Sequence, residues 1–282
     1  MPLPLAMTFA VVVSFLSPGD AARLVDDGAT VLDGRGRFAF RRGHLPGAQR
    51  TDWEDFRDGW GRTGRLGADL VPLADRLAGL GVDQGRPVLV YGDGGAGFGE
   101  EGRLAWMLAY LGHPRVHLLD GGFQAWTAAA GRVVQGGAGR PRPGRFAPRP
   151  QAALRRDLAA VMLHRSKGDA LLLDVRSAEE WAGRTPFWEA RGGHLPEARH
   201  LDWRQLLGPD GRLLPEAELR RRLGRRGVDG TRPVVTYCTA GVRSAFVWAV
   251  LLQLGFAAAN YDGSMWEWSA RRELPLVQGG PE

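Results

Sequence analysis

The 282-residue chain is poor in cysteine and lysine, with only Cys238 and Lys167. A single cysteine excludes an intramolecular disulfide and any zinc site built from several cysteines, so we expect no metal. The sequence also lacks an apolar run long enough to span a bilayer. Its longest candidate, near the N-terminus, has no basic residues before it. We therefore interpret residues 9–16 as a first β-strand in preference to a signal peptide, and expect a cytoplasmic protein without membrane contact.

The positive charge of the chain is almost entirely arginine, and the net charge is +6. The arginines are spread along the sequence and interleaved with Asp and Glu, whereas a nucleic-acid surface usually concentrates them in one helix or stripe. We therefore expect no nucleic-acid partner. A positive field would still favour small anionic substrates. Apolar residues at 44% and charged residues at 24% are ordinary for a soluble globular protein.

Short motifs of the first half recur in the second half in the same order, which indicates an internal repeat. The matching segments are 31–35 and 172–176, 43–46 and 193–196, 52–53 and 202–203, 81–83 and 227–229, 86–88 and 232–234, 120–121 and 262–263, with Trp106 and Trp126 matching Trp248 and Trp268. We predict two copies of one domain, over residues 1–135 and 151–282. Residues 136–150 between them are rich in Pro, Gly and Arg and form a linker, since repeated prolines prevent a regular helix or central strand.

Hydrophobic periodicity alternates within each copy. In the second copy, short apolar runs predict buried strands and helical spacing predicts helices. The expected strands are 170–175, 234–237 and 257–261, and the expected helices are 155–165, 215–223 and 243–254, the last ending at Gly255. Strands that alternate with helices predict an α/β fold, in which each domain has a parallel sheet with helices on both faces.

The first copy contains Gly92, Gly94 and Gly97 in a G-x-G-x-x-G pattern, with Asp120 further on. This pattern is typical of a dinucleotide site, but such a site requires the glycines after the first strand of its unit. Here several predicted strands come earlier. The repeat also aligns Gly92 with Cys238 of the second copy. We therefore interpret the glycines as a false match and expect no cofactor.

Cys238 follows a buried strand and precedes a helix, and ligands of open α/β sheets bind at this edge. Gly241 allows the intervening loop to curl, so that main-chain N–H groups point inward. The helix start and Arg243 add positive charge, and together these features should lower the pKa of Cys238 and make it a nucleophile. The alternative is an inert cysteine at the end of a strand.

The segment 237–244, Tyr-Cys-Thr-Ala-Gly-Val-Arg-Ser, resembles the active-site loop of the rhodanese family, and the two-domain layout resembles the tandem thiosulfate and 3-mercaptopyruvate sulfurtransferases. The resemblance implies a catalytic second domain, an inactive first domain, and sulfur transfer through a persulfide on Cys238. It also implies a substrate-binding loop. The implied substrate-binding residues are Thr239, Ala240, Gly241, Val242, Arg243 and Ser244, with Arg191 as an anion binder.

The sequence does not match either donor pattern of the family. Arg243 favours a dianionic donor such as thiosulfate, with cyanide, a thiol or a protein thiol as the acceptor. The alternatives are 3-mercaptopyruvate as donor, a persulfide carrier or regulatory module, and a cysteine-based phosphatase or arsenate reductase. The last is disfavoured, because those enzymes place five residues between Cys and Arg and this loop has four.

Several other residues are expected to have structural or positional roles. Glu180 stands where the family often has a substrate arginine. We expect structural roles for Asp174, Asp262 and His194, since His194 has a counterpart in the inactive copy. The segment 185–190 is an insertion absent from the first copy, which places it near the mouth of the active site.

Overall fold

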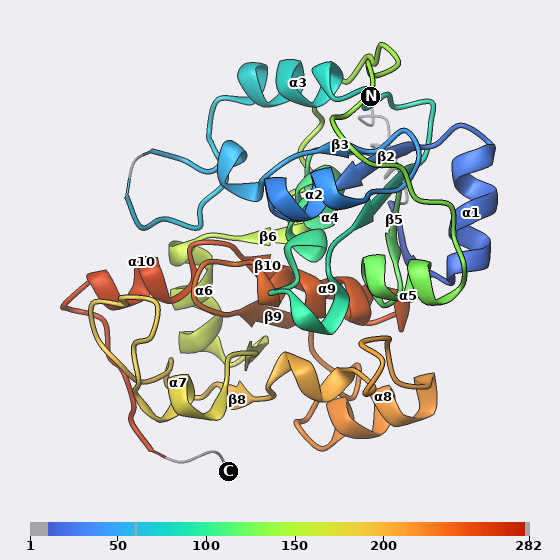
Figure 1. Ribbon diagram of the computed structural model, residues 1–282. Coiled ribbons are helices and arrows are strands. Elements are labelled where there is room, and N and C mark those ends of the chain that lie inside the picture. Colours follow the sequence, from blue (N-terminus) through green and yellow to red (C-terminus); the bar gives the residue numbers. More distant parts are fainter. Residues whose placement is uncertain (1–10, 60, 280–282) are drawn as a thin grey trace, which may run out of the picture.

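The computed structural model describes residues 11–59 and 61–279 and contains two parallel sheets (Figure 1). The first sheet has the order β1-β5-β4-β2-β3 and the second the order β6-β10-β9-β7-β8, so the two copies share one topology. The strands of the first sheet are β1 (Val12–Leu16), β2 (Thr30–Asp33), β3 (Gln49–Arg50), β4 (Val88–Tyr91) and β5 (Arg115–Leu119). Those of the second are β6 (Arg155–Arg156), β7 (Leu171–Asp174), β8 (Arg199–His200), β9 (Val234–Tyr237) and β10 (Ala258–Tyr261). The predicted α/β fold with two parallel sheets is confirmed.

Helices cover both faces of each sheet. In the first domain they are α1 (Pro18–Asp26), α2 (Arg37–Arg42), α3 (Leu70–Gly79), α4 (Glu100–Tyr110) and α5 (Gly122–Ala128). In the second they are α6 (Leu158–Lys167), α7 (Ala178–Ala182), α8 (Glu216–Gly224), α9 (Arg243–Gln253) and α10 (Ser264–Ala270). Alternate residues of a strand face opposite sides, so Leu89 packs with α1, α2 and α5, while Val88 and Val90 pack with α3 and α4.

The predicted elements of the second copy agree with the structure to within a few residues, with one informative difference. The helix expected at 155–165 begins at Leu158, because Arg155 and Arg156 pair in parallel with β10. The side chain of Asp157 then caps the helix by accepting from the N–H of Ala160 at 2.8 Å. The strand expected at 9–16 is β1, which begins at Val12; residues 9 and 10 lie outside the described part of the chain.

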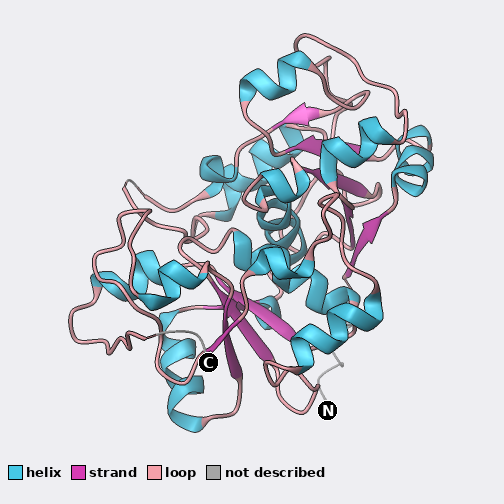
Figure 2. Ribbon diagram, turned by 60° about the horizontal axis from the view of Figure 1, so that its bottom comes forward, coloured by secondary structure: helices cyan, strands magenta, loops and turns pink. Residues whose placement is uncertain are grey.

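The two domains share one core, because α4 and α9 pack against each other between the sheets (Figures 1 and 2). Residues of both helices, including Leu104, Trp106, Phe246 and Trp248, belong to a single buried hydrophobic cluster. The structure thus brings the helix that follows the predicted catalytic loop against the equivalent helix of the first copy. This contact places the start of α4 beside the loop at Cys238.

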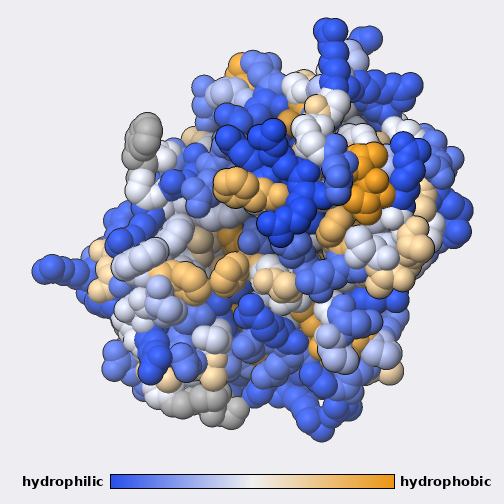
Figure 3. All heavy atoms as spheres, in the orientation of Figure 1, coloured by the Kyte–Doolittle hydropathy of each residue, from blue (hydrophilic) through white to orange (hydrophobic). Residues whose placement is uncertain are grey.

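The segment 136–150 has no regular secondary structure and runs along the first domain. Phe146 is buried against the shared core, and the N–H of Arg145 donates to the Asp83 carboxylate at 3.0 Å. The face of the molecule in Figure 3 is mostly hydrophilic, with apolar residues in small separate groups. Within residues 11–59 and 61–279, no helix is both long and apolar enough to cross a membrane.

Candidate active site

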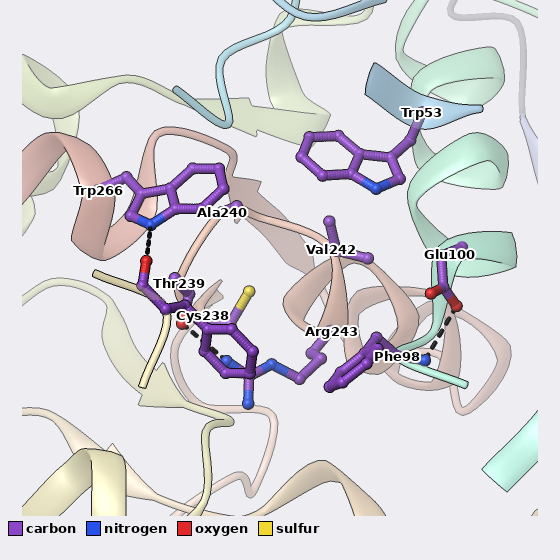
Figure 4. A pocket seen from close by; sticks show the side chains of 10 residues that line it. Trp53, Phe98, Glu100, Cys238, Thr239, Ala240, Val242, Arg243 and Trp266 are labelled. Atoms are coloured by element: carbon purple, nitrogen blue, oxygen red, sulfur yellow. Dashed lines mark hydrogen bonds between the residues drawn. The ribbon is translucent and has the colours of Figure 1, made fainter. Parts of the chain in front are cut away.

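Cys238 lies directly after β9, at the carboxyl edge of the second sheet, and its side chain reaches a cavity of about 150 Å³ (Figure 4). The loop turns back at Gly241, whose φ is +74°. A Cβ at Gly241 would lie 2.6 Å from the Asp262 backbone, so this position requires glycine. The cavity is lined by Trp53, Phe98, Glu100, Phe187, Cys238, Thr239, Ala240, Val242, Arg243 and Trp266.

The surroundings of Cys238 favour its thiolate. Burial opposes ionisation, but the charge of Arg243 and hydrogen bonds from the N–H groups of Ser244 and Ala240 and from the Ser244 hydroxyl outweigh it, so the pKa of Cys238 is lowered. The Ser244 Oγ lies 3.6 Å from the sulfur. The curled loop and the helix start therefore produce the electrostatic environment expected from the sequence.

The catalytic loop is held from behind by β10 and α10. The Asn260 side chain donates to the Gly241 carbonyl at 3.1 Å, and its Oδ1 lies 2.7 Å from the Ser244 hydroxyl, whose one hydrogen is shared between Asn260 and the Cys238 sulfur. The Ser264 hydroxyl accepts from the Cys238 N–H at 3.1 Å. These contacts fix both ends of the loop, so the sulfur and its donors are preorganised before a substrate binds.

Arg243 is buried and its charge is paired. Its guanidinium donates to both Glu180 oxygens, at 2.6 and 2.7 Å, and to the Thr239 hydroxyl at 2.7 Å. That hydroxyl also lies 2.9 Å from Glu180 Oε1 and 3.1 Å from Glu189 Oε1. Burial alone would raise the pKa of Glu180, but the hydrogen bonds and charge of Arg243 hold it at about 2. Arg243 is thus paired with the Glu180 carboxylate, and Glu189 joins the same network through the Thr239 hydroxyl.

The first domain completes the cavity. Trp53 and Trp266 lie on either side of the opening above the Cys238 sulfur, and Phe98 and Glu100 line one flank (Figure 4). The N–H of Phe98 donates to the Glu100 carboxylate at 2.9 Å, and burial raises the pKa of Glu100. The cavity therefore belongs to both domains.

Arg103 of α4 connects the first domain to the back of the catalytic loop. It is buried and donates to the carbonyls of Gly241, at 3.4 Å, and Gly64. It does not line the cavity. Its charge lies close enough to interact with the Cys238 thiolate. The first domain therefore also contributes to the electrostatic field at the nucleophile.

The structure gathers most of the residues predicted for the site. Cys238, Thr239, Ala240, Val242 and Arg243 line the cavity, while Gly241 and Ser244 form the rest of the loop behind it. The insertion at 185–190 lies at the cavity as expected, because Phe187 forms one of its walls.

Arg191 is the exception among the predicted substrate-binding residues. It does not line the cavity. Its guanidinium instead donates to the carbonyls of Ser269, Leu274 and Arg271 in the C-terminal segment. Because these acceptors occupy its donors, Arg191 fastens the C-terminal segment to the domain, and we do not retain it as an anion binder.

The residues expected to be structural do have structural contacts. Asp174 accepts from Arg176 at 2.7 Å, and Arg176 also donates to the Gly193 carbonyl. The His194 ring stacks on Trp181, with centroids 3.4 Å apart. Asp262 accepts from the N–H of Leu66 at 2.8 Å and therefore joins the two domains.

Sequence reasoning did not identify the roles of Trp53, Phe98, Glu100, Glu189 and Asn260. The repeat offered a partial signal for Phe98 and Glu100, because Gly92 and Trp106 are 14 positions apart whereas Cys238 and Trp248 are 10 apart. The four additional residues lie in the loop that reaches the cavity. No comparable signal marks Asn260, whose contacts depend on the pairing of β10 with β9.

The equivalent place in the first domain is filled by a side chain. A Cβ at Gly92 would lie 2.2 Å from the Glu101 Oε2 atom. The Glu101 carboxyl is buried, this oxygen has no hydrogen-bond partner, and burial raises its pKa to about 8. The first domain therefore lacks both the nucleophile and the space for it.

The comparisons with known proteins agree with this geometry. A family model described as a rhodanese-like domain matches residues 17–129 and 157–271. A probable 3-mercaptopyruvate sulfurtransferase of Pseudomonas aeruginosa is 34% identical, covering 92% of this chain and 95% of that protein. A thiosulfate sulfurtransferase of the same organism is 31% identical over 93% and 96% of the two chains.

A third relative and a solved structure extend the comparison. The sulfur carrier protein TtuD of Thermus thermophilus is 31% identical, covering 84% of this chain and 86% of that one. The crystal structure of SseA from Escherichia coli, a 3-mercaptopyruvate sulfotransferase, superposes with a TM-score of 0.79 at 26% identity, over 90% and 99% of the two chains. The chain therefore belongs to the rhodanese family and consists of two rhodanese-like domains.

Proposed function

We propose that the protein transfers a sulfane sulfur from thiosulfate to cyanide or a thiol through a persulfide on Cys238. The Cys238 thiolate attacks the outer sulfur of thiosulfate, the S–S bond of the donor breaks, and sulfite leaves with the electron pair. The acceptor then attacks the outer sulfur of the persulfide and regenerates the thiolate. With cyanide the product is thiocyanate. This is nucleophilic catalysis in two steps, without a net change of charge in either step.

The position of Cys238 in the wall of a cavity, beside Arg243 and the N–H groups that lower the pKa of its thiol, is the observation that carries this proposal. The same N–H groups and the Ser244 hydroxyl that stabilise the thiolate would stabilise the outer sulfur of the persulfide. The relatives named thiosulfate and 3-mercaptopyruvate sulfurtransferases support the reaction class. The sequence of the loop, with four residues between Cys238 and Arg243, supports a ring that surrounds a single sulfur.

A second candidate is a persulfide carrier that passes its sulfur to a protein thiol. The relationship to TtuD, which is named a sulfur carrier protein, favours this possibility. Carriage and catalysis require the same persulfide, and they differ in the acceptor. We also propose a cytoplasmic location, because reducing conditions keep a lone catalytic thiol free of disulfides.

Intact mass measurement tests the proposal. After incubation with thiosulfate, the native protein should gain about 32 Da, the mass of one sulfur atom expected for the first covalent half-reaction. Cys238→Ser should not gain it, and cyanide should remove it from the native protein with release of thiocyanate. An equal gain in both proteins would exclude Cys238 as the nucleophile. Persulfide that is discharged by a protein thiol but not by cyanide would favour the carrier.

A further inference from the structure

We propose that the cavity, which both domains build, accepts thiosulfate but favours sulfur donors that bear an apolar or aromatic organic group and at most one negative charge over such dianions. This inference rests on the proposed persulfide chemistry at Cys238 and concerns which donors load it. Three observations point to this donor class: the charged groups at the cavity, the aromatic and apolar side chains that line it, and the segments of the two repeats that supply those side chains.

The charges at the cavity do not favour a dianion. Arg243 is the one cationic residue among the described residues that line it. Both of its outer nitrogens donate to Glu180, at 2.6 and 2.7 Å, so its charge is compensated before a donor arrives. Glu189 is bound to the same Thr239 hydroxyl and Glu100 lies on the opposite flank, which adds two carboxyl groups. Among the described residues that line the cavity, no second cation is present to meet a second negative charge on the donor.

The walls of the cavity instead suit an organic group. Trp53, Phe98 and Trp266 stand around the opening, with Val242 and Ala240 near the sulfur (Figure 4). Phe187 also lines the cavity. The Phe98 and Phe187 rings meet edge to face, with centroids 5.9 Å apart. Although it contacts this ring, Phe98 is still 46% exposed. Apolar surface of this kind gains free energy when a donor removes it from water.

Of the three places where the spacing of matched motifs differs between the repeats, two supply these walls. Between matching residues, Asp33 and His44 are 11 positions apart, whereas Asp174 and His194 are 20 apart, and the longer segment carries Phe187 and Glu189. The longer loop of the first copy carries Phe98 and leads to Glu100. The features that make the two domains unequal therefore determine what surrounds the nucleophile.

Two donors with the same reacting bond provide the test. Thiosulfate has two negative charges, whereas benzenethiosulfonate has a phenyl group in place of one oxygen and a single charge. In both, Cys238 attacks the outer sulfur, the S–S bond breaks, and sulfite or benzenesulfinate leaves with the electron pair. The measured quantity is kcat/KM for thiocyanate formation with each donor, expressed as the ratio of benzenethiosulfonate to thiosulfate. The two donors also differ in intrinsic reactivity, and this difference cancels when the ratio is compared between the native protein and a variant.

Three substitutions should change this ratio in defined directions. Phe98→Ala should lower kcat/KM for benzenethiosulfonate at least threefold more than kcat/KM for thiosulfate. Glu100→Gln and Glu180→Gln should raise kcat/KM for thiosulfate at least threefold more than for benzenethiosulfonate, since they remove a negative charge or free Arg243. Phe38→Ala and Glu54→Gln are the matched controls, because both residues are exposed in the first domain and neither lines the cavity.

The outcomes separate this inference from the proposed function. A ratio above one in the native protein that falls in the three cavity variants and not in the controls supports the selection. Preference for thiosulfate, or a ratio unaffected by both Phe98→Ala and Glu100→Gln, overturns it while the persulfide on Cys238 still forms. If neither donor adds a sulfur to Cys238, the proposed function itself fails. Glu100→Gln is nearly isosteric, so the test holds even where Phe98→Ala does not fold.

Discussion

A side chain at Gly92 should clash with Glu101, and the clash should be measurable as a coupling between the two residues. A Cβ at position 92 would lie 2.2 Å from the Glu101 Oε2 atom, whereas carbon and oxygen normally approach to about 3.3–3.6 Å. The carboxyl would therefore have to retreat by about 1 Å. Since Glu101 is fully buried within a close-packed core, it has little room to do so.

We expect Gly92→Ala to lower the free energy of unfolding by about 1–2 kcal/mol. Overpacking of this kind costs about 1–3 kcal/mol. About 0.4–1 kcal/mol of this cost is offset, because alanine has less conformational freedom than glycine in the unfolded chain. Alanine can adopt the backbone conformation of Gly92, since its φ is not in the left-handed region. In the background of Glu101→Ala the carboxyl is absent, so the same change should no longer destabilise. The coupling energy between the two sites should therefore be about 1–3 kcal/mol.

Urea unfolding of the native protein, both single variants and the double variant gives this coupling. Additive effects, or a Gly92→Ala variant at least as stable as the native protein, would refute the reasoning. Gly92→Cys provides the functional counterpart. In the background of Cys238→Ser it should gain no sulfur from thiosulfate, because position 92 faces a carboxyl where Cys238 meets Arg243 and inward N–H groups.

Three further results are expected. Ser244→Ala should slow alkylation of Cys238 by iodoacetamide at pH 7 about tenfold, since a hydrogen bond to a charged group contributes about 1.5 kcal/mol; an unchanged rate would exclude the hydroxyl from thiolate stabilisation. Asn260→Leu should lower kcat about tenfold, because the Ser244 hydroxyl and the Gly241 carbonyl lose a partner worth about 1–3 kcal/mol; native kcat with an intact circular dichroism spectrum would contradict this. Glu101→Gln should remove a pH dependence of stability. The folded protein keeps a proton on Glu101 that the unfolded chain releases above 4.5, so native stability should fall by about 1.4 kcal/mol per pH unit up to about 8, as urea midpoints at pH 5.5 and 7.5 would reveal.

The sequence by itself determined the architecture and the nucleophile. The repeat established two similar domains, because equivalent motifs recur in one order, and apolar runs bounded by turns located β7, β9 and β10. Cys238 could be found because chain order alone places a strand end, a glycine and a helix start around it. These are local properties, and local sequence is sufficient to encode them.

Only the tertiary structure decided what surrounds that nucleophile. Glu180 lies 63 positions from Arg243 in the sequence, and no local pattern indicates that it would compensate the arginine charge. Phe98 and Glu100 reach the cavity because α4 packs on α9, and this long-range contact depends on the shape of both domains. Arg191 illustrates the converse, since the resemblance to the family implied an anion binder whereas the fold directs its guanidinium to main-chain carbonyls. Side-chain partners are set by packing between distant segments, so the chemistry of Cys238 was readable from the sequence and the selectivity of its cavity was not.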